Sequence, residues 1–371
     1  MVVSTRPLWG QISLDALRHN MSEVSRLAGP GVHIMPAIKA NAYGHGVINV
    51  ARVLADSDPL ALVTGNIDEA IEVRRSGIRT PIVMLSHCPP TELVDVAEAG
   101  FIPTIVDLAG AEALSTPNGQ PRDIYIKVDC GLRRLGVSLD ALAAFVKQVV
   151  VMPGISVVGI YTHVPFHDNS GAQWSRARIK AFDDVLKNLA AEGVVIPVTQ
   201  SKSSANLLAR HQDMSNAVCV GHLLYGLPCT DADVGNASMF RPVLRSIKSR
   251  IIHINCQTGI SNGPSPYMSR NSTLTGVVPV GLNDGLRNPK ESCTMEMLVR
   301  GCRVPVLGVS LEHCVLDLNG VVSEVGDEVT IVGVDGEEII GLSDLAMWHG
   351  CSEREVMMLF SGRVSMSEES T

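Results

Sequence analysis

At 371 residues the chain is longer than one typical domain. Its hydrophobic residues, 46% of the total, are enough for a large core, and its 18% of charged residues are too few for a disordered chain. The net charge of −8 is spread along the sequence without a basic stripe, which argues against a nucleic-acid partner.

Targeting and redox signals are also missing from the sequence. It does not open with a basic stretch followed by an apolar one, and it contains no run of about 18 apolar residues. The nine cysteines are an odd number without a CxxC pair, which indicates free thiols rather than disulfides or a metal site. We therefore expect a cytoplasmic protein with no membrane span and no bound metal.

The first two thirds of the chain alternate between short apolar runs and amphipathic segments. The runs are rich in Val and Ile and lie at 32–38, 60–64, 81–85, 102–106, 123–128, 157–162, 194–199 and 217–225. Segments of helical period lie at 15–28, 67–75, 139–150 and 174–191. Eight strand-helix units predict an α/β fold of the TIM (β/α)8 barrel type.

The pattern changes after about residue 239. Runs rich in β-branched residues, separated by Gly, Pro and Asn-Gly turns, lie at 243–254, 273–280, 298–309, 315–318 and 328–332. We predict a barrel domain over residues 1–240 and a C-terminal β domain over 241–371, with the extreme N-terminus pairing with the β domain. Residues 364–371 are expected to form a frayed tail.

A lysine closes the first predicted barrel strand. Residues 39–46 read KANAYGHG, so Lys39 lies at the C-terminal face of the barrel, where active sites of this fold lie. The alternative for a lysine in such a loop is a solvated surface residue. The string closely resembles the cofactor-lysine motif of the alanine racemase family, which puts its lysine on the first strand.

The resemblance extends through the barrel. It continues in VTGNIDEA at 63–70, IKVDCGLRRLG at 126–136 and GIYTH at 159–163, and it is weaker in the β domain. It implies an enzyme that binds pyridoxal 5'-phosphate through Lys39 and acts on an amino acid. It also implies a homodimer with shared active sites.

Several barrel residues receive roles from this resemblance. Tyr43, Ser204 and Gly221 match residues that contact the cofactor phosphate, and a helix N-terminus suits a phosphate. Ser204 equally fits an ordinary helix N-cap. Arg134 matches the arginine near the cofactor's phenolic oxygen and the substrate carboxylate, where a guanidinium fork suits a carboxylate. Its neighbour Arg133 is expected to be an ordinary surface residue.

Two further matches leave alternatives open. Lys127 aligns with a lysine that some family members carbamylate, and an unmodified lysine inside the barrel is the other reading. His163 matches a residue beneath the pyridine ring, and a core histidine with satisfied hydrogen bonds is the alternative.

The family's second base is replaced. The resemblance implies that racemisation uses the cofactor lysine on one face of Cα and a tyrosine of the partner subunit on the other. Asn262 stands at that tyrosine's position, and Tyr267 is the sole tyrosine of the β domain. Tyr267 is either a substitute base or part of a Pro- and Gly-rich surface turn. Leu282 and Leu311 replace two other residues that the partner subunit brings to the active site.

Cys219 stands where the family has an arginine facing the pyridine nitrogen. A cation there discourages protonation of the ring, and a thiol removes that restraint. A small apolar core residue is the alternative role for Cys219.

Three functions follow from these matches and departures. The first is a racemase or epimerase of altered mechanism or substrate. The second is a pyridoxal-phosphate lyase working on one face of Cα, by aldol cleavage, decarboxylation or β-elimination. The third is a catalytically silent cofactor-binding protein, against which Lys39, Arg134, His163 and Ser204 argue.

Overall fold

A computed structural model describes residues 6–116, 119–230, 237–256 and 273–369. The chain divides into two compact units. Unit 2 comprises Leu14–Ala42 and Val47–Arg241, and unit 1 comprises the described parts of Met1–Ser13, Tyr43–Gly46 and Pro242–Thr371. None of the described helices is long and apolar enough to cross a membrane.

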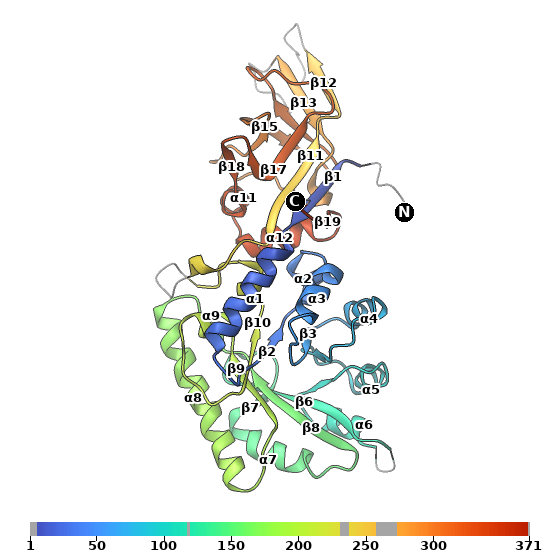
Figure 1. The fold of residues 1–371 in the computed structure, drawn as a ribbon, viewed down its shortest axis with the longest axis vertical. Coiled ribbons are helices and arrows are strands. Elements are labelled where there is room, and N and C mark those ends of the chain that lie inside the picture. Colours follow the sequence, from blue (N-terminus) through green and yellow to red (C-terminus); the bar gives the residue numbers. More distant parts are fainter. Residues whose placement is uncertain (1–5, 117–118, 231–236, 257–272, 370–371) are drawn as a thin grey trace. The chain divides into compact units, whose positions relative to one another are not determined.

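Unit 2 is a barrel of parallel strands, several of which are labelled in Figure 1. The described strands are β2 (His33–Pro36), β3 (Leu62–Thr64), β4 (Ile82–Met84), β5 (Thr104–Ile105), β6 (Arg122–Asp129), β8 (Ile155–Thr162), β9 (Val198–Lys202) and β10 (Ala217–Val220). One sheet runs β2-β10-β9-β8-β6-β5 and a second pairs β3 with β4. Parallel bridges join Ala37 to Val63 and Val83 to Ile102, which closes the ring. The predicted TIM barrel is confirmed.

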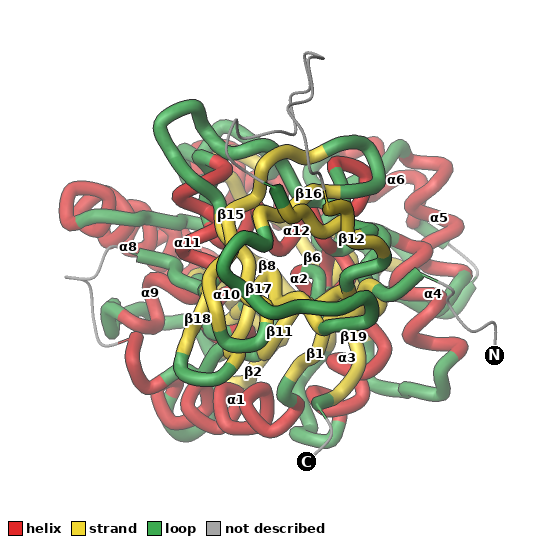
Figure 2. The backbone as a smooth tube through the Cα atoms, turned by 90° about the horizontal axis from the view of Figure 1, so that it is seen from above, coloured by secondary structure: helices red, strands yellow, loops and turns green. Residues whose placement is uncertain are grey.

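Helices of unit 2 lie outside these strands (Figure 2). They are α1 (Leu14–Ala28), α3 (Val47–Ala55), α4 (Ile67–Arg75), α5 (Pro90–Glu98), α6 (Leu108–Leu114), α7 (Leu139–Val149), α8 (Asn169–Ala191), α9 (Ser204–Leu208) and α10 (His222–Tyr225). The short α2 (Lys39–Tyr43) follows β2, and a two-residue strand, β7 (Val137–Ser138), pairs with β6. The four segments predicted as helices are confirmed, with α8 beginning five residues before the predicted 174.

Two predicted strands were placed wrongly. The run 194–199 overlaps β9 at its last two residues, because the apolar stretch continues the turn after α8 rather than entering the barrel. The run 217–225 contains β10 and then α10, whose leucines pack as a helix after Gly221. An apolar run alone does not separate a strand from a short buried helix.

The barrel interior is filled by side chains from neighbouring strands. Met35, Val63, Val83, Tyr125, Tyr161 and Ala217 form one buried cluster. The Tyr125 and Tyr161 rings lie 6.3 Å apart between centroids. A Cβ at Gly159 would lie 2.2 Å from the Tyr125 ring, so a residue without a side chain is required there.

Unit 1 is dominated by one large, mainly antiparallel sheet (Figure 1). Its strands are β1 (Leu8–Ile12), β11 (Leu244–Arg250), β12 (His253–Cys256), β13 (Leu274–Val278), β14 (Glu296–Val299), β15 (Cys302–Val309), β16 (Cys314–Asp317), β17 (Glu328–Asp335), β18 (Glu338–Ile340) and β19 (Ser365–Glu368). The order is β12-β13-β16-β15-β14-β17-β11-β1-β19, with β18 paired to β17. The N-terminal β1 pairs with β11.

The end of unit 1 differs from expectation. Residues 364–371 were predicted to fray, but β19 pairs in parallel with β1 from Trp9 to Ile12. Two helices, α11 (Leu342–His349) and α12 (Glu353–Phe360), were not predicted, and the run 243–254 forms two strands rather than one. The tail was misjudged because its strand partner, β1, lies at the other end of the sequence.

Candidate active site

Lys39 begins a turn of left-handed backbone. Ala40, Asn41 and Ala42 have φ of 54°, 53° and 53°, and Tyr43 has φ of 53°. A residue with a Cβ loses roughly 1–2 kcal/mol in this conformation. Four such residues in succession therefore require strong local support, and backbone strain of this kind clusters at functional sites.

Side chains from the barrel supply that support. The Asn41 N–H donates to Glu69 Oε1 at 2.7 Å, and the Thr64 hydroxyl donates to Glu69 Oε2 at 2.6 Å. The Asn41 side chain accepts a hydrogen bond from the Val47 N–H, at the start of α3, at 2.8 Å. These contacts give Asn41 a structural role in the motif, because its backbone N–H and its side-chain oxygen both hold the turn that follows Lys39.

Lys127 lies inside the barrel on β6, with its amine 5.1 Å from the centre of the Tyr161 ring. Its side chain is buried. Burial, together with the positive charges of Arg134 and Lys39, lowers the pKa of Lys127 to about 8. Lys127, Arg134 and Lys39 are therefore close enough to repel one another.

The loop after β6 is folded around one carboxylate. Asp129 accepts hydrogen bonds from the N–H groups of Gly131 at 2.7 Å, Arg133 at 3.1 Å and Arg134 at 2.9 Å. Burial raises the pKa of Asp129, but these backbone donors outweigh it and hold the pKa below its usual range. The positive charge of Arg134 acts on Lys127. Arg133 and Arg134 are both exposed, and Arg133 has φ of 57°.

His163 follows the last residue of β8 and is partly buried. Burial lowers the pKa of His163 to about 3, with added repulsion from Arg134, Lys39 and Lys127. The imidazole is therefore neutral at physiological pH. A neutral ring suits packing against an aromatic cofactor, and it adds no further charge to the three cations.

Cys219 lies on β10, opposite Met35 of β2. Burial raises the pKa of Cys219 to about 11, although the charges of Lys39 and Lys127 oppose this rise. The side chain is thus a neutral thiol beside two lysines. It packs against the interior cluster and also faces the candidate site, so both roles considered for it from the sequence are compatible with its position.

Two hydrogen-bonding groups meet where β9 and β10 end. Ser204 opens α9, is 5% exposed, and its hydroxyl accepts a hydrogen bond from the Gly221 N–H at 3.2 Å. Ser203, the N-cap residue of α9, donates its N–H at 3.0 Å and its hydroxyl at 2.7 Å to the Asn206 side chain. Capping by Ser203 leaves Ser204 free of that role.

These groups come from the carboxyl ends of β2, β6, β8, β9 and β10, which meet at one end of a parallel barrel. An amine, two further cations, a neutral imidazole and the Ser204 hydroxyl fit a ligand that carries an aldehyde, an aromatic ring and a phosphate. Pyridoxal 5'-phosphate has these three features. Among the described residues, no group of three or more His, Cys, Asp or Glu side chains is placed to hold a metal ion.

The remaining predicted residues belong to unit 1. Tyr43 is buried, and the imidazole Nδ1 of His45 lies 3.0 Å from its carbonyl oxygen. Leu282 is 42% exposed and Leu311 is 71% exposed. Asn262 and Tyr267 fall in 257–272, outside the described residues.

Sequence reasoning assigned no role to three residues that shape the site. Glu69 and Asp129 hold the loops of Lys39 and Arg134, and His222 adds to the positive charge felt by His163. Glu69 and Asp129 stand inside the strings that carried the resemblance, which was the available signal. Their partners could not be read from the chain, because a hydrogen bond to a distant backbone N–H leaves no pattern in the sequence.

Comparison with known proteins agrees with this geometry. Residues 12–228 match the family "Alanine racemase, N-terminal domain" and residues 244–367 match "Alanine racemase, C-terminal domain". Alanine racemase of Desulfosudis oleivorans is 33% identical over 96% of this chain and 95% of its own length. That of Desulforamulus reducens is 33% identical over 96% and 98%.

Solved structures show the same relationship. Alanine racemase from E. faecalis matches with a TM-score of 0.88 at 26% identity, over 100% of both chains. Alanine racemase from Bacillus anthracis with bound L-Ala-P matches with a TM-score of 0.86 at 26% identity, over 98% of this chain and 95% of that one. The chain therefore belongs to the alanine racemase family and is a pyridoxal-phosphate-dependent enzyme that acts at the Cα of an amino acid.

Proposed function

We propose that the chain is an amino-acid racemase or epimerase that uses Lys39 on one face of Cα and a group other than the family's usual tyrosine on the other. The observation that carries the proposal is the cluster of Lys39, Lys127 and Arg134 at one end of the barrel, whose positive charges act on the neutral His163.

Each barrel residue has a distinct task in this reaction. When bound, pyridoxal phosphate would supply an electron sink that makes the Cα proton acidic. Lys39 would hold the cofactor, and its amine would move the proton on its own face of Cα. Arg134 binds the substrate carboxylate, and Ser204 and Gly221 bind the phosphate. His163 packs against the ring as a neutral imidazole.

The second face is where this chain departs from its relatives. Asn262 has no basic group, and Leu282 has no ionisable group either. We propose Tyr267 of the partner subunit as the substitute base. Losing a general base typically removes about 10²–10⁴ in rate, so we expect alanine to exchange its α-proton on one face faster than it inverts.

A one-face lyase is the second candidate, and Cys219 is the observation that favours it. The neutral thiol stands where the family has a cation, so ring protonation meets less resistance. A ring that can be protonated stabilises a carbanion at Cα whichever bond breaks, so cleavage of a bond other than Cα–H becomes accessible.

One experiment separates the candidates. The enzyme is incubated with L- and D-amino acids, alanine included, in deuterated water, and α-deuteration, chirality and carbon loss are read together. Deuteration with slow inversion and no carbon loss supports the racemase, and Tyr267→Phe should then abolish inversion while exchange on one face persists. Carbon loss or an eliminated product supports the lyase. An absence of α-exchange with every amino acid rejects both.

We further propose a cytoplasmic homodimer. The nine cysteines are all unpaired, which suits a reducing compartment. A dimer would bring Asn262, Leu282 and Leu311 to the active site of the partner. Sedimentation at micromolar concentration tests this, and a fully active monomer would reject it.

A further inference from the structure

Two loops of unit 1 are bound to each other through their backbones. The first spans 281–284 and the second spans 310–313. The Leu282 N–H donates to the Ser310 carbonyl at 2.9 Å, and the Asn283 N–H donates to the Leu311 carbonyl at 3.0 Å. Gly281 makes this approach possible, because a Cβ there would lie 2.5 Å from the Ser310 oxygen and 2.6 Å from the Glu312 nitrogen. The loops therefore form one piece that carries Leu282 and Leu311.

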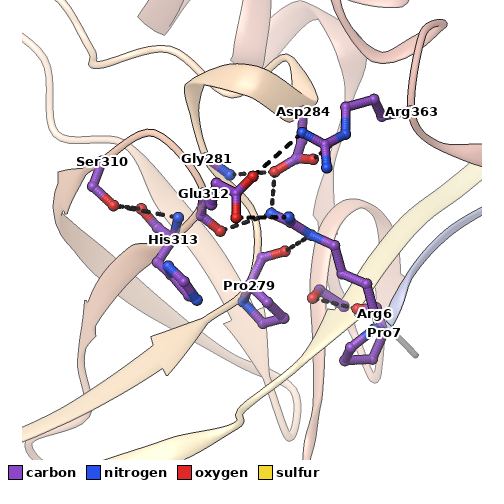
Figure 3. Close-up of polar contacts among 10 residues, drawn as sticks. Arg6, Pro7, Pro279, Gly281, Asp284, Ser310, Glu312, His313 and Arg363 are labelled. Atoms are coloured by element: carbon purple, nitrogen blue, oxygen red, sulfur yellow. Dashed lines mark hydrogen bonds and ion pairs between the residues drawn. The ribbon is translucent and has the colours of Figure 1, made fainter. Parts of the chain in front are cut away.

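Arg6 ties this piece to the N-terminus (Figure 3). Its Nη2 donates to Asp284 Oδ2 at 2.5 Å and to the Glu312 carbonyl at 2.7 Å, and its Nε donates to the Pro279 carbonyl at 3.0 Å. One guanidinium thus binds Pro279, which precedes the first loop, Asp284, which ends it, and Glu312 of the second loop.

A second guanidinium completes the arrangement. Arg363 Nε lies 3.6 Å from Asp284 Oδ1, and its Nη1 lies 3.6 Å from Glu312 Oε1 (Figure 3). Arg6 Nη1 lies 3.6 Å from Glu312 Oε2. The Asp284 side chain is 0% exposed and also accepts the Gly281 N–H at 2.9 Å. We call Arg6, Asp284, Glu312 and Arg363 the loop clamp.

The clamp holds the loop backbones that carry two exposed leucines. Leu282 and Leu311 are 42% and 71% exposed, so packing within unit 1 restrains them weakly. Their loop backbones are instead held by charge-assisted hydrogen bonds, which are roughly twice as strong as neutral ones. A buried charge such as that of Asp284 is costly unless it is paired, and the guanidinium groups of Arg6 and Arg363 supply that pairing.

We propose that the loop clamp positions Leu282 and Leu311 for the active site of the partner subunit. Arg6 would then control substrate binding in a site whose barrel residues all belong to the partner. This inference rests on the proposed function. Arg6, Asp284, Glu312 and Arg363 are positioning residues rather than catalytic ones.

The test is complementation between two variants. Arg6→Met breaks the clamp, and Lys39→Ala removes the cofactor anchor. Differently tagged chains are co-expressed and the hybrid dimer is isolated. One of its two sites joins the intact Lys39 of the Arg6→Met chain to the intact loops of the Lys39→Ala chain.

The Arg6→Met homodimer should lose about 10- to 100-fold in kcat/KM for α-proton exchange, chiefly through KM, as misplacing a positioning group does. It should keep its cofactor absorbance. Hydrogen exchange at the Leu282 and Asn283 amides should become faster. The hybrid should recover the wild-type KM at one site per dimer.

Arg303→Met is the matched control. Arg303 also pairs with two carboxylates of unit 1, Glu296 at 3.2 Å and Glu338 at 2.6 Å. The Arg303→Met variant should have the same KM as the wild-type enzyme. If Arg6→Met does not fold, Arg363→Met removes one side of the clamp at a residue that is 40% exposed, and a smaller KM effect in the same direction is expected.

The outcomes are distinct. A hybrid that keeps the high KM overturns the inference alone, and so does an Arg6→Met enzyme that loses thermal stability with an unchanged KM. A wild-type enzyme without α-proton exchange on any amino acid overturns the proposed function and the clamp's role together.

Discussion

The backbone N–H of Asn41 donates a 2.7 Å hydrogen bond to Oε1 of Glu69, a residue 28 positions later in the chain. Asn41 has φ of 53°, so the bond fixes a backbone conformation that is unfavourable by itself. The other oxygen of Glu69 accepts the Thr64 hydroxyl at 2.6 Å. Glu69 therefore joins the Lys39 turn to the end of β3.

Glu69→Ala is expected to loosen the Lys39 turn. The Asn41 N–H and the Thr64 hydroxyl would lose their acceptor, and each unsatisfied group costs about 1–3 kcal/mol. Urea denaturation should show the loss of stability, and cofactor titration should show weaker binding. Glu72→Ala, at an exposed site on the same helix, is the control. Equal cofactor affinity in both variants would contradict this account.

Lys39→Ala is expected to abolish the yellow colour of the purified protein. The amine is the sole covalent anchor in the proposed site, so dialysis should remove the remaining cofactor. Lys180→Ala removes an exposed lysine that pairs with Asp184 and should leave the absorbance unchanged. An Lys39→Ala protein that stays coloured after dialysis would reject the assignment.

Lys127 is expected to make stability depend on alkaline pH. Its pKa is about 8 in the folded protein and 10.5 ordinarily. Between these values the unfolded chain binds more protons, so this lysine's contribution to folding stability rises with pH. Below pH 8 the charged amine destabilises the folded protein by its full amount. Between pH 8 and 10.5 the free energy of unfolding rises with pH by at most about 1.4 kcal/mol per pH unit.

The measurement compares wild type with Lys127→Met by denaturation from pH 7 to 10.5. Wild type should gain stability relative to the variant as pH rises. Lys180→Met, at an exposed site, should run parallel to wild type. Parallel curves for wild type and Lys127→Met would show that folding does not lower the pKa of this amine.

Gly159→Ala is expected to destabilise the barrel. The added Cβ would lie 2.2 Å from the Tyr125 ring, and overpacking of a core typically costs about 1–3 kcal/mol. Gly362→Ala, where a Cβ meets nothing within 4 Å, is the control. If thermal denaturation gave the two variants equal stability, the Tyr125 ring would have to be able to move aside.

The strand that contains Gly159 could be predicted from the sequence, but the contact that Gly159 makes with Tyr125 could not. The strand at 157–162 was expected from its apolar pattern, and β8 runs from Ile155 to Thr162. The contact with Tyr125 was not expected, because strand pairing in a barrel depends on register across the sheet. The prediction of a strand at 194–199 was wrong because it relied on a local apolar pattern alone. In the barrel the strand begins only at Val198.

The sequence by itself determined the barrel, the appended β sheet and the position of Lys39 at a strand end, because periodicity and turn residues act over a few neighbouring positions. Tertiary structure alone decided that three cations converge on one site, that β19 pairs with β1, and that Arg6 binds Asp284 across 278 positions of sequence. Charge interactions and hydrogen bonds depend on distance in space. Folding sets those distances, and residues far apart in the chain carry no mutual pattern that would reveal them.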